Sequence, residues 1–132
     1  MMLNTIFDIF FSYTALKYQY TIYAIGEIFM PVTISAKKDR LITHLSGEID
    51  HHSAKTIRTE IDVSISKHSP MLLEMDFSKV SFMDSSGIGL VMGRCKAMNI
   101  YGGKVIVKNA SPEIQKVMML SGLDRLVTIT NS

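Results

Sequence analysis

The sequence predicts an α/β domain with a mixed β-sheet and helices packed mainly on one face. Strand and helix patterns alternate after residue 30, which is typical of parallel crossover connections. Two apolar runs, residues 32–36 and 41–45, flank the polar turn 37–40 and predict an antiparallel hairpin at the start. Because only three helices are expected over about a hundred residues, they are more consistent with one layer than with helices on both faces.

The first predicted helix follows Gly47-Glu48-Ile49. Asp50 or Ser53 is suited to cap it, because their side-chain oxygens accept hydrogen bonds from free backbone N–H groups. Apolar side chains recur three or four residues apart along residues 54–65, and Ser69-Pro70 ends the pattern. A buried strand is expected at residues 71–77, and a second helix at residues 85–99.

The C-terminal third continues the alternation. Tyr101-Gly102-Gly103 ends the second helix, and residues 104–108 form a short apolar strand pattern. Ser111-Pro112-Glu113 predicts a helix start with a capping serine, proline at the first position and an acid in the first turn. Ser121-Gly122 closes that helix, and residues 126–129 predict the last strand.

The composition is that of a globular domain and excludes a disordered protein. A chain of 132 residues with 47% apolar and 20% charged side chains has enough apolar residues for one core. The net charge of +2 comes from scattered basic residues, so direct nucleic-acid binding is not expected. The single cysteine, Cys95, cannot form an internal disulfide and favours a cytoplasmic location.

Residues 1–29 differ in composition from the rest and form an N-terminal extension to a domain at 30–132. They contain no uninterrupted apolar run long enough for a membrane span, and no signal-peptide pattern. Gly26-Glu27 can be encoded by purine-rich codons positioned like a bacterial ribosome-binding site before Met30. We therefore expect Met30 to be the true start. A membrane-surface anchor or an added packing element is the alternative.

The most informative segment is Ser-Phe-Met-Asp-Ser-Ser-Gly-Ile-Gly-Leu at residues 81–90. Asp84, Ser85 and Ser86 stand where the second helix begins. Serine and aspartate favour this position as caps, and the positive end of the helix dipole tolerates an anion. The pattern predicts an exposed serine hydroxyl suited to a phosphorylation switch, with Asp84 as the cap and Ser86 able to cap when Ser85 is modified.

The second helix has two distinct faces. Ile88, Val91, Met92, Cys95 and Met98 have core spacing and predict packing on the sheet. The opposite face carries Ser86, Gly89, Leu90, Gly93 and Arg94. Glycine inside a helix costs about 1 kcal/mol relative to alanine, so two glycines one turn apart suggest close approach by another backbone. We interpret this face as a docking surface with Leu90 as its anchor; simple tolerance of glycine is the alternative.

From residue 31 to 131 the chain resembles the STAS-domain anti-anti-sigma factors, and within them the antagonists of endospore-forming bacteria. The residues that carry the resemblance are Gly-Glu-Ile-Asp-His-His at 47–52, Ser-Phe-Met-Asp-Ser-Ser-Gly-Ile-Gly at 81–89, Gly102-Gly103 and Ser121-Gly122-Leu123. Residues 1–29 have no counterpart in the family pattern.

The resemblance implies a regulator rather than an enzyme. Such a protein binds an anti-sigma factor that is also a serine kinase and thereby frees the sporulation sigma factor. The kinase phosphorylates the residue matching Ser85, a serine phosphatase reverses this, and ATP belongs to the kinase, so no cofactor is expected here. The family fold also brings Asp50 near the switch. The expected partner contacts are Asp50, Asp84, Ser86, Gly87, Gly89, Leu90, Gly93 and Arg94.

Two alternatives compete with this interpretation. An enzyme with Ser85 or Ser86 as nucleophile lacks the glycine that a hydrolase elbow places two residues earlier. The four histidines lack the paired spacing of a zinc site, so no metal is expected. The closer alternative is a STAS antagonist in a general-stress sigma-factor pathway. Residues Asp50-His51-His52 favour the sporulation group through the resemblance.

Overall fold

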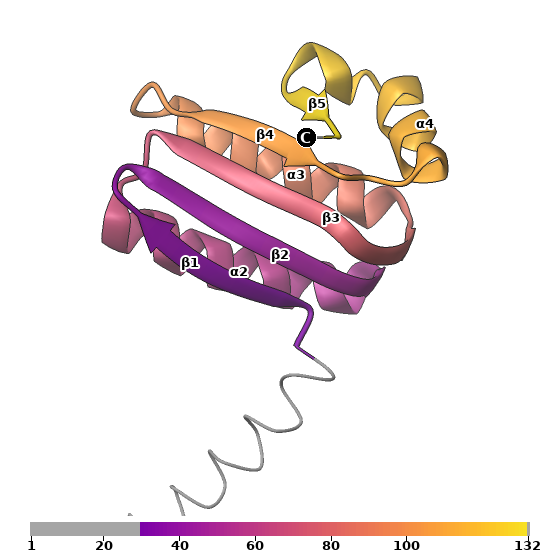
Figure 1. Ribbon diagram of the computed structural model, residues 1–132, viewed down its shortest axis with the longest axis horizontal. Coiled ribbons are helices and arrows are strands. Elements are labelled where there is room, and N and C mark those ends of the chain that lie inside the picture. The colour runs from indigo at the N-terminus through magenta and orange to yellow at the C-terminus, as the bar shows by residue number, and fades with distance from the viewer. Residues whose placement is uncertain (1–29, 132) are drawn as a thin grey trace, which may run out of the picture. The chain divides into compact units, whose positions relative to one another are not determined.

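A five-stranded sheet organises the domain, with its strands side by side in sequence order. The computed structural model describes residues 30–131. Strands β1 and β2 are antiparallel, whereas β2, β3, β4 and β5 are parallel, so the predicted mixed sheet is confirmed. The strands are β1 (Val32–Lys37), β2 (Arg40–Ile49), β3 (Leu72–Met83), β4 (Lys104–Lys108) and β5 (Thr128–Thr130) (Figure 1).

The two long helices lie against one face of this sheet, as predicted. Helices α2 (His51–His68) and α3 (Ser85–Asn99) follow β2 and β3 and pack on each other as well as on the strands (Figure 1). The shorter helix α4 (Pro112–Leu120) packs with the 3-10 turn η1 (Leu123–Arg125). Each parallel strand pair needs such a crossover, because its strands must start at the same edge.

The helices begin where the sequence predicts. Asp50 caps α2, Asp84 caps α3, and Ser111 caps α4 before its proline. Each cap has an extended backbone and accepts a hydrogen bond from the first turn, which satisfies donors that the helix leaves unpaired.

The core lies between the sheet and the helices. Strand side chains that alternate toward the helices are buried, and so are the apolar stripes of α2 and α3. Cys95 is buried among them, as predicted. The fully buried members with the largest side chains include Phe77, Leu41, Leu45, Ile49, Ile57, Ile61, Leu73, Met75, Met98 and Val91.

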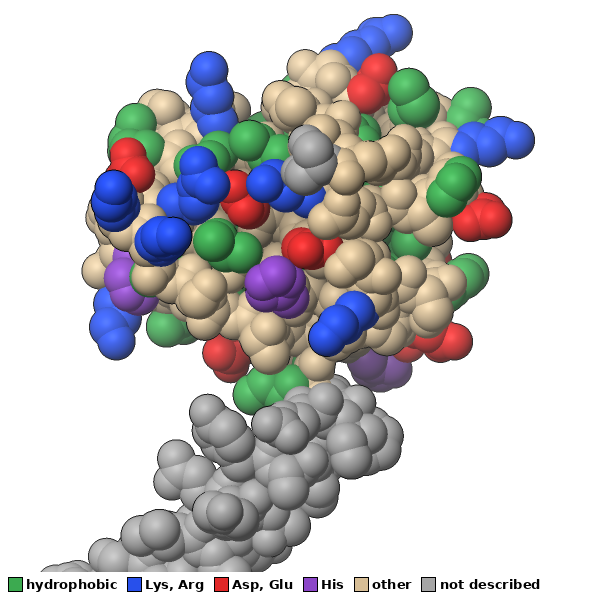
Figure 2. All heavy atoms as spheres, in the orientation of Figure 1, with side chains coloured by type: hydrophobic (Ala, Val, Ile, Leu, Met, Phe, Trp, Pro, Cys, Tyr) green, Lys and Arg blue, Asp and Glu red, His purple; other side chains and the backbone are tan. Residues whose placement is uncertain are grey.

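The sheet face away from α2 and α3 is polar. Figure 2 shows several Lys and Arg side chains gathered on this side. Glu74 is buried there because Arg40 Nη1 and Lys108 Nζ approach its Oε1 at 2.8 and 3.3 Å. His44 Nδ1 lies 3.4 Å from Asp76 Oδ2. These charged groups lie on the face of the sheet opposite α2 and α3.

Three strand boundaries differ from prediction. Strand β2 continues to Ile49 instead of ending at residue 45. Strand β3 continues to Met83 instead of ending at residue 77, because β2 keeps pairing with it as far as Ile49 opposite Met83. Val80 and Met83 are buried, while Ser81 and Phe82 are exposed, so the segment lacks a regular apolar alternation. The last strand begins at Thr128 because η1 occupies the residues after Gly122, which has a left-handed backbone.

The chain divides into two units, Met1–Met30 and Pro31–Ser132. The predictions for residues 1–29, including the start at Met30, lie outside the described residues. Within residues 30–131, no helix has the length and apolarity needed to cross a membrane.

Candidate functional site

Two helix N-termini meet at one edge of the sheet. Strands β2 and β3 are parallel, and their last residues, Ile49 and Met83, are register partners. The backbone N–H of Asp84 donates to the carbonyl oxygen of Ile49 at 3.2 Å. Asp50 and Asp84, the residues that follow the paired strand ends, therefore lie close together. Both helix dipoles direct their positive ends to this edge.

The Asp50 carboxylate is part of a capping box. Its Oδ1 accepts hydrogen bonds from the backbone N–H groups of His52 and Ser53, each at 2.9 Å. Ser53 Oγ accepts in return from the Asp50 N–H at 2.9 Å. The backbone hydrogen bond from Ser53 is the main reason that the pKa of Asp50 lies below its ordinary value. Asp50 thus lies near the start of α3, and its carboxylate is hydrogen-bonded within the first turn of α2.

Ser85 is exposed at the first position of α3. Asp84 Oδ1 accepts from the N–H of Ser86 at 2.8 Å, which confirms Asp84 as the cap. The N–H of Gly87 donates to the Asp84 carbonyl oxygen at 3.0 Å. The first turn therefore holds the Ser85 backbone in place while Ser85 remains exposed to solvent.

Three of the expected contact residues are buried, and the prediction that Leu90 and Arg94 lie on an exposed docking face is wrong. Leu90 is 3% exposed and Arg94 is 6% exposed, and Gly87 is also buried. Arg94 Nε pairs with Asp62 Oδ1 of α2 at 2.9 Å. Helix α2 covers this side of α3, so α3 has a second buried face besides the one on the sheet.

The glycines of α3 differ in what surrounds them. A Cβ at Gly87 would collide with the side chain of Met83 and reach Ile49, so the close approach there is internal. A Cβ at Gly89 or Gly93 would meet no described atom within 4 Å. Gly89 is exposed and Gly93 is half-buried. Contacts among residues 30–131 therefore do not explain why these two positions are glycine.

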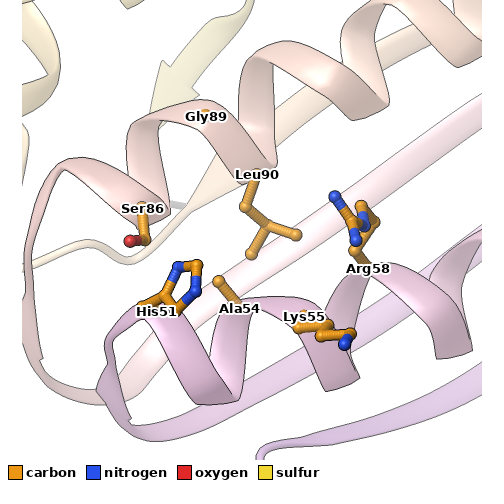
Figure 3. Close-up of a pocket in the computed structure, with 7 residues that line it drawn as sticks. All are labelled: His51, Ala54, Lys55, Arg58, Ser86, Gly89 and Leu90. Carbon is orange, nitrogen blue, oxygen red and sulfur yellow. The ribbon is translucent and has the colours of Figure 1, made fainter.

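A groove of about 310 Å³ runs between α2 and α3 and reaches the switch (Figure 3). Ser86, Gly89 and Leu90 form its α3 side, with Leu90 pointing inward. The α2 side consists of His51, Ala54, Lys55 and Arg58.

Sequence reasoning missed Phe82 as a surface residue. Its side chain is 52% exposed three residues before Ser85, and it pairs in register with Glu48 of β2. A large exposed aromatic beside a switch is a typical interface anchor. An available signal was the set of polar residues near it, Lys79, Ser81 and Asp84, which interrupt a second apolar core stripe.

The site lacks the parts of a metal centre. Among the residues that the structure describes, no three His, Cys, Asp or Glu side chains are grouped to hold an ion. His51 and His52 are exposed, with ring centroids 5.8 Å apart and an edge-on arrangement.

Comparison with known proteins identifies the class. The STAS domain family model matches residues 32–132, and the chain belongs to that family. Within it, the chain is similar to antagonists of anti-sigma factors. An anti-sigma F factor antagonist from Paenibacillus polymyxa is 35% identical over 89 residues, which cover 67% of this chain and 76% of that protein. An anti-sigma-B factor antagonist from Listeria monocytogenes is 26% identical over 105 residues, which cover 77% and 91%, respectively.

Solved structures give the same relationship. The anti-sigma factor antagonist SpoIIAA in its unphosphorylated form aligns with a TM-score of 0.67 and 33% identity, over 74% of this chain and 86% of that chain. The Bacillus cell fate determinant SpoIIAA in its phosphorylated form aligns with a TM-score of 0.61 and 33% identity, over 74% and 89%. The STAS fold, with a mixed sheet and the two long helices on one face, agrees with the fold predicted from the sequence.

Proposed function

We propose that this protein is a phosphorylation-switched anti-sigma factor antagonist that acts in the cytoplasm. In its unphosphorylated form it binds an anti-sigma factor that is also a serine kinase, and the sporulation sigma factor is released. Phosphorylation of Ser85 blocks this binding, and a serine phosphatase restores it. The proposal depends on one observation: Ser85 is exposed at the first position of α3, where two helix N-termini meet.

The helix ends favour a phosphoserine that leaves the fold intact. A phosphate adds about −1.5 to −2 charges and three acceptor oxygens. Anions near a helix N-terminus are stabilised by about 0.3–1 kcal/mol at exposed sites. Ser85 occupies such a position on α3, and α2 begins at the neighbouring strand end. The added charge is therefore tolerated by the domain, whereas a partner docked over Ser85 has to accommodate it.

The proposed docking face surrounds Ser85. Phe82 replaces Leu90 as its apolar anchor, because Phe82 is exposed and Leu90 is not. Gly89 and Gly93 leave the outer side of α3 open to a close backbone approach. Truncation of a buried aromatic anchor at an interface typically costs 2 kcal/mol or more, roughly 30-fold in affinity.

Incubation with the cognate anti-sigma factor and ATP, followed by phosphopeptide mapping, tests the proposed switch. We expect one phosphate on Ser85, and none after Ser85→Ala. The alanine variant should still bind the anti-sigma factor, whereas Ser85→Asp should bind at least tenfold more weakly, equivalent to about 1.4 kcal/mol. Phe82→Ala should weaken binding without abolishing phosphorylation at high kinase concentration.

Ser86→Ala is the matched control for the adjacent hydroxyl. It should still be phosphorylated on Ser85, because Ser86 is half-buried whereas Ser85 is exposed. Phosphate on Ser86 instead of Ser85, or wild-type affinity of Ser85→Asp, contradicts the proposal. Transcription from sigma-dependent promoters in the presence of the antagonist then identifies the sigma factor that is released and separates sporulation from general stress.

A further inference from the structure

We propose that the groove between α2 and α3 receives an acidic side chain of the anti-sigma factor. The site comprises Lys55 and Arg58 on one wall and Ser86 on the other, and it opens beside the switch serine. This proposal rests on the proposed function and specifies the chemistry of the partner surface. The occupant is a carboxylate from an exposed loop or helix of the anti-sigma factor.

The walls of the groove carry positive charge only. His51, Lys55 and Arg58 contribute basic side chains, and none of the lining residues is acidic. Neither Lys55 nor Arg58 forms an ion pair with any residue between 30 and 131. The nearby cap carboxylates are already engaged, that of Asp50 by α2 and that of Asp84 by α3. A carboxylate entering the groove thus meets cations without a competing acid on its walls.

Arg94 adds a second, independent observation. It lies one turn beyond Leu90, which lines the groove, and its side chain is 7% exposed. Its Nη1 is buried without a hydrogen-bond partner among the described residues. Buried donors of this kind are rare and costly. Its ion-pair partner is Asp62, whose Oδ1 lies 2.9 Å from Nε.

The two guanidinium groups repel one another. Burial is the main reason that the pKa of Arg94 is lowered; Asp62 opposes this, and the positive charge of Arg58 lowers the pKa further. The Arg94 guanidinium thus has one neighbouring carboxylate, Asp62, and one neighbouring cation, Arg58, and Lys55 adds a further positive charge to the groove wall. An added carboxylate between the helices offsets this excess, which is the electrostatic complementarity that favours an acidic partner.

The groove also links docking to the switch. Ser86 lines it and is adjacent to Ser85. A phosphoryl group on Ser85 brings its negative charge to the mouth of the groove, where it attracts the same cations and repels an incoming carboxylate. The groove therefore supplies a local reason for the sensitivity of binding to phosphorylation.

Charge-reversal variants of the full chain test the proposal in binding assays with the cognate anti-sigma factor at low and high ionic strength. Lys55→Glu and Arg58→Glu should each weaken binding about tenfold or more at low salt. The neutral variants Lys55→Gln and Arg58→Gln should lose less affinity. Wild-type binding should weaken as salt is raised, and the charge-reversal variants should show a smaller salt dependence.

Lys116→Glu on α4 is the matched control, because it changes the net charge equally at an exposed position outside the groove. It should bind within about twofold of wild type. The acidic-contact proposal is overturned if Lys55→Glu and Arg58→Glu both bind with wild-type affinity. It is also overturned if these two variants and Lys116→Glu lose affinity equally. Failure of the wild-type chain to bind the anti-sigma factor at any salt concentration is a distinct result, since it overturns the proposed function itself.

Discussion

Replacement of Gly89 by alanine should stabilise the domain and weaken partner binding at the same time. Gly89 lies inside α3, is exposed, and has no described atom within 4 Å of an added Cβ. Alanine is favoured over glycine in a helix by about 1 kcal/mol. For a domain of about 100 residues this raises the melting temperature by about 4–8 °C.

The binding effect has the opposite sign. If a partner backbone approaches α3 closely at Gly89, an added methyl group overpacks the interface. Overpacking of a close contact costs about 1–3 kcal/mol, which corresponds to about 5-fold to 150-fold in affinity. Thermal unfolding by circular dichroism measures the first quantity, and isothermal titration calorimetry with the anti-sigma factor measures the second.

Ser66→Ala is the control, because Ser66 is exposed near the end of α2 and outside the docking face. It raises helix propensity modestly and should leave affinity unchanged. A Gly89→Ala variant that is more stable and binds as tightly as wild type refutes the reasoning. Gly89 would then be a tolerated helix glycine, the alternative that the sequence left open.

Three further outcomes are expected. Gly87→Ala should destabilise the domain by up to about 2 kcal/mol in urea denaturation, because the new Cβ collides with Met83; a stabilised variant contradicts this contact. Asp84→Ala should lower the free energy of unfolding by about 1 kcal/mol through loss of the cap, whereas the asparagine variant should retain most of it. Burial raises the pKa of Asp76, but hydrogen bonds led by those from Ser78 outweigh this and lower it. Its contribution is therefore complete above about pH 4 and is lost as the pH falls through the folded pKa; Asp76→Asn should flatten this acid limb of the stability profile.

Local signals in the sequence were sufficient for the helix starts and the mixed sheet. Asp84 and Ser111 cap helices where their chemistry predicts, since a cap depends on atoms only two or three residues away. The end of β3 was missed because its continuation depends on pairing with β2, more than thirty residues earlier in the chain. Phe82 belongs to that continuation, which explains why its exposure was overlooked.

The burial of α3 shows what the apolar periodicity of its sequence does not predict. A single apolar stripe predicts which side meets the sheet, and Val91 and Met98 are buried as expected. The stripe gives no information about a neighbouring helix, yet α2 covers Leu90 and pairs with Arg94 through Asp62. A helix that packs on both a sheet and another helix buries more of its circumference than a single apolar stripe covers. A residue on the side of the helix that faces away from the sheet can therefore still be buried.

The position of the switch follows from this topology. Because β2 and β3 are parallel, α2 and α3 both begin at the same edge of the sheet. The serine at the start of α3 therefore lies beside two helix N-termini and a basic groove. These features stabilise a phosphate within the domain, while the same phosphate opposes a partner that uses the groove or covers Ser85. Under the proposed function, phosphorylation of Ser85 should therefore change the free energy of association much more than that of folding. A serine placed in the middle of α3 would lack the helix-end stabilisation, and its phosphate would disturb the fold and the interface together.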